Sequence, residues 1–234
     1  MDLSTISSIT IPEGEVVSIA SGNVVLWESN GLPSAYQKVE YIQDINTGTA
    51  YLNLGFAFDT AATIEFGMYF LSGQTIGQIF GATEDSGKLR CLGTIPVSSG
   101  QGSFYGSTGS AYTSIPFSIS TGKIDLVVTI KKGIFTVYNA QNNSTTKETT
   151  QGEFKMTNNL HLMGQNYNGT NRCAGWRRVY YFRYFDKNNT LICDLVPCYR
   201  KADGVIGMYD LVRQQFLTNQ AKSGTNFTKG ADVA

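Results

Sequence analysis

Two polar loops hold the aromatic and amide side chains best suited to chemistry, and that chemistry is recognition of a neutral sugar. The first loop spans Ser98 to Ser114 and the second spans Gln165 to Arg172. Sugars are bound when their C–H faces stack on aromatic rings while amide or guanidinium groups bond their hydroxyls. The candidate glycan-binding residues are Tyr105, Tyr112, Asn166, Tyr167, Asn168, Asn171 and Arg172. The alternative is that both loops are flexible and their tyrosines only rest on the body of the protein.

Groups that could catalyse a reaction are few, and each has a plainer explanation. His161 is the only histidine, so at most one general base of this type exists. It alternates with apolar neighbours in Leu160–Met163, which favours an outward-facing strand position. Isolated acids lie in expected strands or turns, where solvent or an ion partner accounts for them: Glu40, Glu65, Asp125 and Glu153. No Gly-x-Ser-x-Gly elbow or phosphate-binding loop occurs.

The sequence offers little to a metal ion or a redox group. The nearest calcium candidate is Asp186–Asn189, but a hairpin turn explains this segment, and Lys187 adds positive charge where calcium is disfavoured. The cysteines show neither a CxxC pair nor zinc spacing, which favours reduced thiols. They are Cys91, Cys173, Cys193 and Cys198. We expect no metal site and no cofactor.

Charge and hydropathy restrict the partners. Lys and Arg number 18 and Asp and Glu 18, so the electrostatic drive toward nucleic acid or anionic membranes is missing. Charged residues make up only 15% of the chain, and such polar, weakly charged surfaces suit hydroxyl-rich ligands or large assemblies. No stretch approaches the roughly 18 apolar residues of a membrane span, and Met1–Ser4 lacks the start of a secretory signal. We expect cytoplasmic synthesis, with no binding of nucleic acid and no membrane insertion.

Alternation of apolar and polar residues with period two dominates the chain and predicts an all-β fold. Thr63–Phe70 carries apolar side chains at every second position. Two hairpins are expected, Ile124–Ile130 with Ile134–Tyr138 and Val179–Phe185 with Leu191–Val196. Short strands with Gly-rich punctuation are typical of a sandwich or barrel.

Residues 1–30 form a separate β-rich leader with three expected strands, Ile6–Ile11, Val16–Ala20 and Val24–Trp27. A piece this small cannot bury enough surface to fold alone and needs something to pack against. It is either a docking or oligomerisation module or a segment that packs on its own sandwich. The apolar residues that would make the contact are Ile9, Ile11, Val17, Ile19, Val25 and Trp27.

Two longer segments carry a resemblance. Leu32–Gly55 (LPSAYQKVEYIQDINTGTAYLNLG) and Asp194–Asn219 (DLVPCYRKADGVIGMYDLVRQQFLTN) resemble the opening and the close of one domain family. This is the concanavalin A-like lectin/glucanase (laminin-G-like jelly-roll) domain found in bacteriophage head-fibre, tail and other virion surface proteins. The resemblance implies a jelly-roll β-sandwich over residues 31–234, with the two ends of the domain in neighbouring strands and Leu54 near Phe216. Ile11–Glu28 resembles short leaders that precede appended domains in such phage proteins.

The resemblance implies a virion surface protein, assembled in the bacterial cytoplasm as a head fibre, decoration or tail appendage. It would dock on capsid or tail proteins through the leader and display a lectin-like sandwich for weak, multivalent binding to host surface glycans. A homo-oligomer is expected, and a trimer would suit a fibre. The alternative is a purely architectural capsid or tail cementing protein without a ligand. A glycoside hydrolase is the third hypothesis, but the glucanase pattern Glu-x-Asp-x-Glu is absent, so no enzymatic activity and no catalytic residue are expected.

Overall fold

A computed structural model describes much of the chain from residue 18 onward. The described ranges are 18–21, 24–28, 31–44, 49–59, 62–70, 77–83, 89–94, 101–106, 113–118, 123–131, 134–140, 144–149, 155–172, 177–221 and 226–234. For some of these residues only the backbone is described. Every regular element in these ranges is a strand, and no helix there is long and apolar enough to cross a membrane. The prediction of an all-β chain is confirmed.

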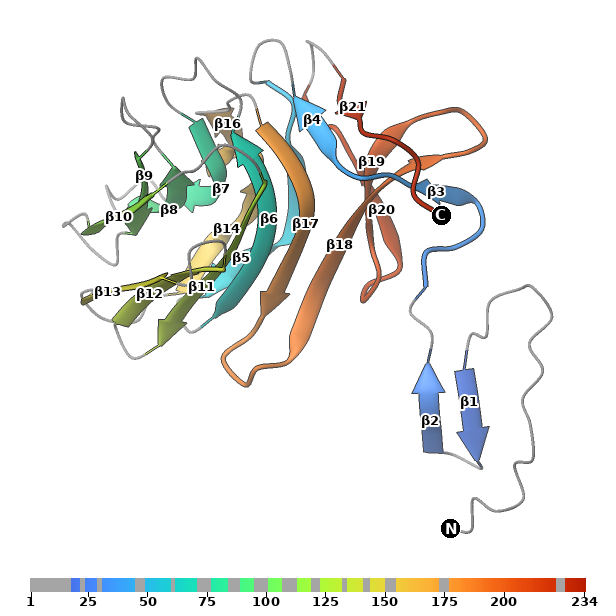
Figure 1. Cartoon of the computed structure of the whole chain (residues 1–234), viewed down its shortest axis with the longest axis horizontal. Coiled ribbons are helices and arrows are strands. Elements are labelled where there is room, and N and C mark those ends of the chain that lie inside the picture. Colours follow the sequence, from blue (N-terminus) through green and yellow to red (C-terminus); the bar gives the residue numbers. More distant parts are fainter. Residues whose placement is uncertain are drawn as a thin grey trace.

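Two sheets form the body of the protein (Figure 1). The main path of the larger one, called here the long sheet, is β13 (Ser144–Thr149), β12 (Ile134–Asn139), β11 (Lys123–Lys131), β6 (Thr63–Phe70), β17 (Arg177–Phe185), β18 (Leu191–Arg200), β19 (Ile206–Asp210) and β20 (Gln215–Thr218). Three further strands complete it: β3 (Tyr36–Lys38), which pairs with β18, β4 (Ile42–Asp44), which pairs with β17, and β21 (Thr228–Lys229), which pairs with β4.

The second sheet, called here the short sheet, packs on the long sheet. Its main path is β10 (Thr113–Ser118), β9 (Gln101–Gly106), β8 (Leu89–Thr94), β7 (Gly77–Thr83), β14 (Lys155–Leu162) and β5 (Leu52–Asp59). Two short strands branch from it: β15 (Gln165–Tyr167) and β16 (Thr170–Arg172). The β15–β7 pair is parallel, while the pairs along both main paths are antiparallel.

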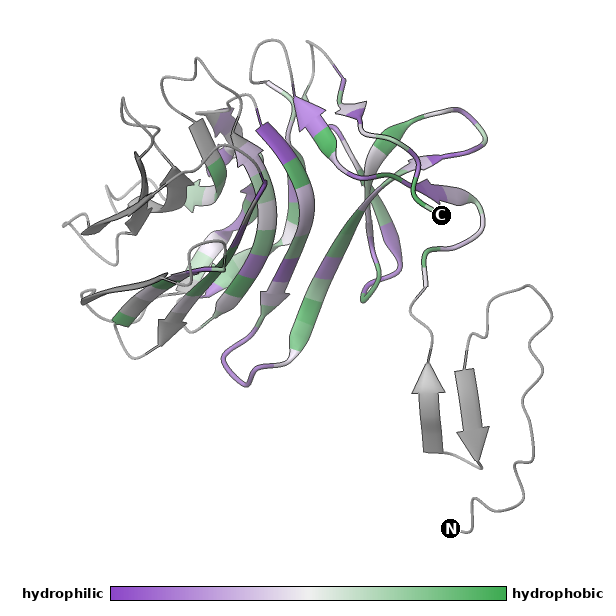
Figure 2. Ribbon diagram, in the orientation of Figure 1, coloured by the Kyte–Doolittle hydropathy of each residue, from purple (hydrophilic) through white to green (hydrophobic). Residues whose placement is uncertain are grey.

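The core lies between the sheets and follows from the alternation in the sequence. Ile64, Phe66 and Met68 of β6 are fully buried, as the alternation of Thr63–Phe70 predicts. Bands of apolar and polar residues alternate along β17 in Figure 2. Phe80 of β7 meets Phe66 and Phe182 of the opposite sheet edge-on, with ring centroids 5.5 and 5.6 Å apart. Such edge-to-face contacts add to the free energy gained by removing the rings from water.

Both expected hairpins are present. β11 pairs with β12 and β17 pairs with β18 in antiparallel register. The second turn closes because the Asp186 carboxylate accepts hydrogen bonds from the backbone of Asn188 and Thr190, both at 2.8 Å. Asn189 takes a φ of 64°, a left-handed angle that asparagine tolerates.

The opening and closing segments of the domain lie side by side. Val39 bridges to Asp232, and Glu40 N donates to the Ala231 carbonyl at 3.0 Å. Further along, Gln220 N donates to the Tyr51 carbonyl at 3.0 Å. The chain ends of residues 31–234 are therefore joined by backbone hydrogen bonds, as the resemblance implies.

In the leader, β1 (Ser18–Ser21) pairs antiparallel with β2 (Val24–Glu28) to form a two-stranded sheet of its own. Ile19 lies opposite Trp27 and Ala20 opposite Val25. The strand expected at Ile6–Ile11, with Ile9 and Ile11, falls outside the described residues, and so does Val17 of the next expected strand. The boundary near residue 30 and the docking role of the leader stay predictions.

Candidate glycan-binding site

The second sequence-predicted loop is an ordered hairpin, β15–β16, set into the short sheet. The chain leaves β14 through Met163, whose φ of 65° turns it sharply, so that β15 runs back parallel to β7. At the tip, Asn168 and Gly169 have φ values of 47° and 81°. Two successive positive φ angles are those of a type I′ turn, for which Asn-Gly is the preferred pair. The sequence thus specifies the tip locally.

A buried amide network holds this hairpin in place. Asn166 is only 5% exposed; its Nδ2 donates to the Asn159 carbonyl at 2.8 Å and its Oδ1 accepts from Gly169 N at 2.7 Å. Gln165 Nε2 donates to the hydroxyl of Thr83. Buried amides with both ends bonded stabilise one conformation, because breaking either bond leaves an unsatisfied group. Of the candidates, Asn166 therefore serves the hairpin itself.

His161 belongs to the same network, and its expected outward-facing position is wrong. It is 2% exposed, stacks on the Tyr51 ring at 4.4 Å, and its Nδ1 lies 3.1 Å from Asn171 Oδ1. Tyr51 and Asn171 cover the face of β14 that alternation alone leaves open to solvent. Burial lowers the pKa of His161 and the bond to Asn171 opposes this, so the imidazole is neutral at neutral pH.

The polar groups near the surface of the β15–β16 hairpin come from its tip and from Asn158 of β14. Asn168 is exposed and Tyr167 half-buried. Asn158 of β14 donates from Nδ2 to Asn168 Oδ1 at 3.3 Å and to the Thr83 carbonyl at 2.6 Å. Asn158 was not expected from the sequence; the signal for it is a pair of successive asparagines, Asn158 and Asn159, inside a strand. A tyrosine and fixed amides in one hairpin tip are groups of the kind that bind a sugar.

The remaining candidates, Tyr105, Tyr112 and Arg172, have no described side chain. Tyr105 lies in β9, and the order β9-β8-β7-β15 places it about 14 Å from β15 by strand spacing. Tyr112 falls outside the described residues, and of Arg172 only the backbone in β16 is described. The candidates with described side chains all lie in the hairpin of the second predicted loop: Asn166, Tyr167, Asn168 and Asn171.

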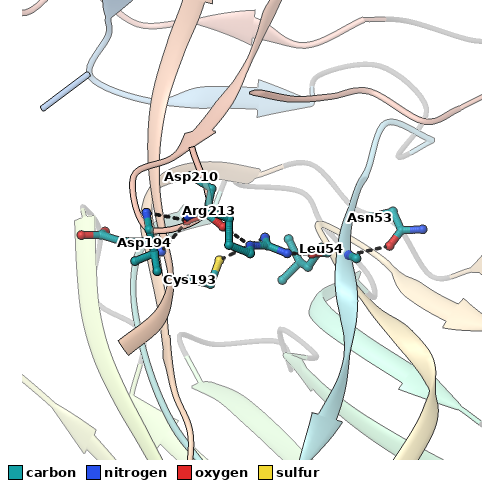
Figure 3. Close-up of polar contacts among 8 residues, drawn as sticks. Asn53, Leu54, Cys193, Asp194, Asp210 and Arg213 are labelled. Carbon is teal, nitrogen blue, oxygen red and sulfur yellow. Dashed lines mark hydrogen bonds and ion pairs between the residues drawn. The ribbon is translucent and has the colours of Figure 1, made fainter. Parts of the chain in front are cut away.

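Arg213 forms another polar cluster, which links the two sheets (Figure 3). Its Nε donates to Asp210 Oδ2 at 2.5 Å and its Nη1 to the Leu54 carbonyl at 2.5 Å. Asp210 is fully buried, and its Oδ1 accepts from the backbone N of Asp194, Val212 and Arg213. This cluster joins the close of the domain to its opening strand. All its strong acceptors are used, so its role is structural.

The acids expected to be paired or solvated have partners where they are described. Glu65 lies 3.6 Å from Arg183, and Asp125 lies 3.2 Å from Lys123. Glu40 is exposed and accepts from Ala231 N at 3.3 Å. Glu153 falls outside the described residues, and the described part of the chain holds no group of three or more His, Cys, Asp or Glu arranged for a metal ion.

The described cysteines are buried thiols. Cys193 and Cys198 are free, and burial raises the pKa of both, that of Cys198 to about 12. A thiol with a raised pKa is a poor nucleophile. Cys91 and Cys173 have no described side chain.

No protein-family model matches the chain, and no curated protein matches it in sequence. Solved structures do match. Mouse laminin α1 domains LG4-5 align over 81% of this chain and 48% of that one, with 13% identity and a TM-score of 0.51. The heptameric SAP-like pentraxin of Limulus polyphemus aligns over 64% of this chain and 77% of that one, with 14% identity and a TM-score of 0.49.

A third match is the enzymatically active domain of bacteriophage CBA120 tailspike protein 2. It aligns over 69% of this chain and 31% of that one, with 15% identity and a TM-score of 0.41. This chain thus spans about half of the laminin fragment and less than a third of the solved tailspike fragment. The protein has the concanavalin A-like jelly-roll fold, in its laminin-G-like form. At these identities the likeness establishes the fold and nothing finer.

Proposed function

We propose that the protein is a bacteriophage virion surface protein that docks through its leader and displays the jelly roll for weak, multivalent binding to host surface glycans. The observation that carries the glycan part is the β15–β16 tip, where Asn168 is hydrogen-bonded to Asn158 and follows the half-buried Tyr167 in the chain. The virion part rests on the resemblance of Leu32–Gly55 and Asp194–Asn219 to phage domains.

The tip is suited to a ligand because it is held before the ligand arrives. Asn166 bonds both the tip and β14, so little conformational freedom is lost on binding. A single shallow contact of one ring and two amides gives weak affinity. Many copies on one particle multiply such an affinity by about 10² to 10⁴, which is enough for attachment.

We propose further that the protein is not an enzyme. His161 is buried, and Asp210, Glu65 and Asp125 are held by basic partners. A glycosidase needs one carboxylic acid and one carboxylate facing each other across an open cleft. Release of reducing sugar from host polysaccharide by the purified full chain would contradict this proposal.

The test of the glycan site is binding of the full chain to a glycan array, with two pairs of matched variants. Tyr167→Ala and Asn168→Gly should each reduce the bound signal at least about tenfold, because each removes a stacking or hydrogen-bonding group. Glycine keeps the positive φ of Asn168, so this variant removes the amide without straining the turn.

The controls are Tyr199→Ala in β18 and Asn189→Gly, which has the same left-handed backbone in the β17–β18 turn. Both should bind like the unmodified protein. Equal loss in the test and control variants would show that the effect is on folding, and unchanged binding in all four would rule out this site.

An architectural role without a ligand is the second candidate, and one observation favours it. The amides of Asn166 and Asn171 form hydrogen bonds within the protein. Fewer polar groups are therefore left to bind a ligand than the sequence predicts. This role predicts no signal on glycan arrays together with tight co-purification with capsid or tail protein.

A further inference from the structure

A row of polar side chains crosses the long sheet away from the β15–β16 hairpin. In register, Gln43 of β4 lies opposite Arg178 of β17, Arg178 lies opposite Tyr69 of β6, and Tyr69 lies opposite Lys123 of β11. Register partners in neighbouring strands project from the same face of a sheet. The row therefore presents two cations with a tyrosine between them.

Arg178 is clamped in this row by aromatic rings. Its guanidinium carbon lies 4.5 Å from the centroid of the Tyr41 ring and 5.2 Å from that of Tyr69. Its Nε donates to Gln43 Oε1 at 2.6 Å. The Tyr180 ring stands edge-on to Tyr41 at 5.5 Å, and hydrogen bonding to Arg178 opposes the rise in the pKa of Tyr180 caused by burial. The guanidinium is thus half-buried and fixed in orientation.

Among the described residues, Arg178 differs from three other arginines, each of which has an acidic partner. Arg183, Arg200 and Arg213 each lie within 3.2 Å of an aspartate oxygen. No carboxylate of the described residues lies within ion-pair distance of Arg178. A fixed, partly desolvated cation without a counter-charge attracts an anion from solution.

The chain segments next to this row do not supply the missing acid. The segments that continue directly from β4, β6, β11, β17 and β21 contain no Asp or Glu: 45–48, 71–76, 119–122, 173–176 and 222–225. The acids nearby are engaged elsewhere, Asp125 with Lys123, Glu65 with Arg183, and Glu40 with the backbone of Ala231.

We propose that Arg178, with Tyr41, Tyr69 and Tyr180, forms a second binding site, for the carboxylate group of an acidic sugar. The planar guanidinium fork matches a carboxylate in geometry, and its terminal nitrogens carry donors beyond those that bond Gln43 and Tyr180. The partly exposed tyrosine rings beside it offer faces to the sugar ring. The site lies on the long sheet and is independent of the β15–β16 tip of the short sheet, so it adds charge selectivity to the proposed function.

The test is a heteronuclear NMR titration of the isotope-labelled full chain with tetragalacturonate. The backbone amides around Gln43, Tyr69 and Arg178 should shift, and those of β15 and β16 should not follow the same titration. Neutral maltotetraose should leave the first group unmoved. In Arg178→Gln the affinity should fall about tenfold or more, because a charge-assisted bidentate contact is lost. Arg178→Lys keeps the charge but not the fork and should bind with intermediate affinity.

The matched control is Arg200→Gln, an exposed arginine of the same sheet that is paired with Asp203. It should bind like the unmodified protein. The proposal is overturned if a folded Arg178→Gln variant binds tetragalacturonate as tightly as the unmodified protein, or if the titration causes no localised shifts. If Arg178→Gln does not fold, unaltered binding by Arg178→Lys overturns the proposal in its place. If tetraglutamate binds as tightly as tetragalacturonate, the site is one for acidic peptides. If inorganic sulfate binds as tightly, it is one for small anions. Either result overturns the proposal of an acidic sugar as the ligand. None of these outcomes affects the array test of Tyr167 and Asn168.

Discussion

The buried carboxylate of Asp210 shows how one residue links the start of the domain to its end. Arg213 neutralises it and at the same time bonds the Leu54 carbonyl of the opposite sheet. We predict that Arg213→Ala lowers the free energy of unfolding by about 3 kcal/mol, because it leaves a buried charge without its partner. Urea denaturation measures this value.

The control for that prediction is Arg200→Ala. Arg200 and Asp203 form an ion pair of similar length, but both side chains are more than 40% exposed. Exposed pairs add little to stability, so the urea midpoint should stay almost unchanged. Equal losses in the two variants would show that the buried cluster has no special role.

His161 makes the stability of the protein depend on pH. Burial lowers its pKa in the folded chain, while in the unfolded chain it titrates near the ordinary value of about 6.5. Below pH 6.5 His161 is protonated in the unfolded chain but stays neutral in the folded chain. The free energy of unfolding therefore falls as the pH decreases toward the pKa of His161 in the folded chain. Denaturation curves between about pH 7.5 and 5.5 should show this loss. His161→Gln should be flat in that window, since no other histidine exists; a parallel decline in the variant would contradict the assignment.

Sequence reasoning at this scale succeeds where the cause is local. Asp186–Asn189 was expected to form a hairpin turn by its own backbone preferences, and the structure has this turn. Alternation predicts the face on which His161 lies but not what covers that face, because Tyr51 comes from another strand. Arg178 escapes notice for a similar reason: its clamp is made by β4 and β6, which pairing alone brings beside β17.

At the element scale, β19 and β20 pack so closely that there is no room for a methyl group at Gly207 of β19. A Cβ on Gly207 of β19 would overlap the Leu217 carbonyl oxygen of β20 and approach the Phe216 ring to 3.0 Å. We predict that Gly207→Ala lowers the free energy of unfolding by about 1 to 3 kcal/mol through this overpacking. Amide hydrogen exchange in β20 should become faster than in β17.

The comparison variant is Gly204→Asn in the turn before β19. Gly204 has a φ of 71° but nothing within 4 Å of its Cβ position, and asparagine tolerates left-handed angles. This variant should stay close to the unmodified protein in stability. Comparable destabilisation by both would mean that backbone conformation, and not the contact with β20, controls the response at Gly207.

The expected strands agree with the structure in kind and differ at their ends. β6 occupies the predicted Thr63–Phe70, but β17 begins at Arg177 and β18 continues to Arg200. The extra residues are those that pair with β4, β3 and β19. Strand length is set here by partners distant in sequence, which a local pattern does not contain. β15 pairs with β7 next to the residues of β7 that pair with β14. This placement depends on three strands at once, so a local sequence pattern could not predict it either.

At the scale of the whole molecule, the body (residues 31–234) and the leader (residues 1–30) differ in how far their own contacts can stabilise them. The two ends of the body are held together by the bridge between Val39 and Asp232 and by the hydrogen bond from Glu40 to Ala231. The described part of the leader is one hairpin, and a two-stranded hairpin is marginally stable at best in water. The leader hairpin therefore needs another surface to pack against, which is the physical basis of its proposed docking role.

Deleting residues 1–30 separates these demands. We predict that residues 31–234 remain folded, monomeric and cooperative in urea, with the same array binding per molecule as the full chain. They should no longer join the particle or form the oligomer, because the strand edges and apolar side chains of Ile19, Val25 and Trp27 are gone. Size-exclusion chromatography with light scattering measures the oligomer, and protein analysis of purified particles measures incorporation. Normal incorporation of the truncated chain would move the docking surface to the jelly roll, and an unfolded truncated chain would mean that the leader packs on its own sandwich.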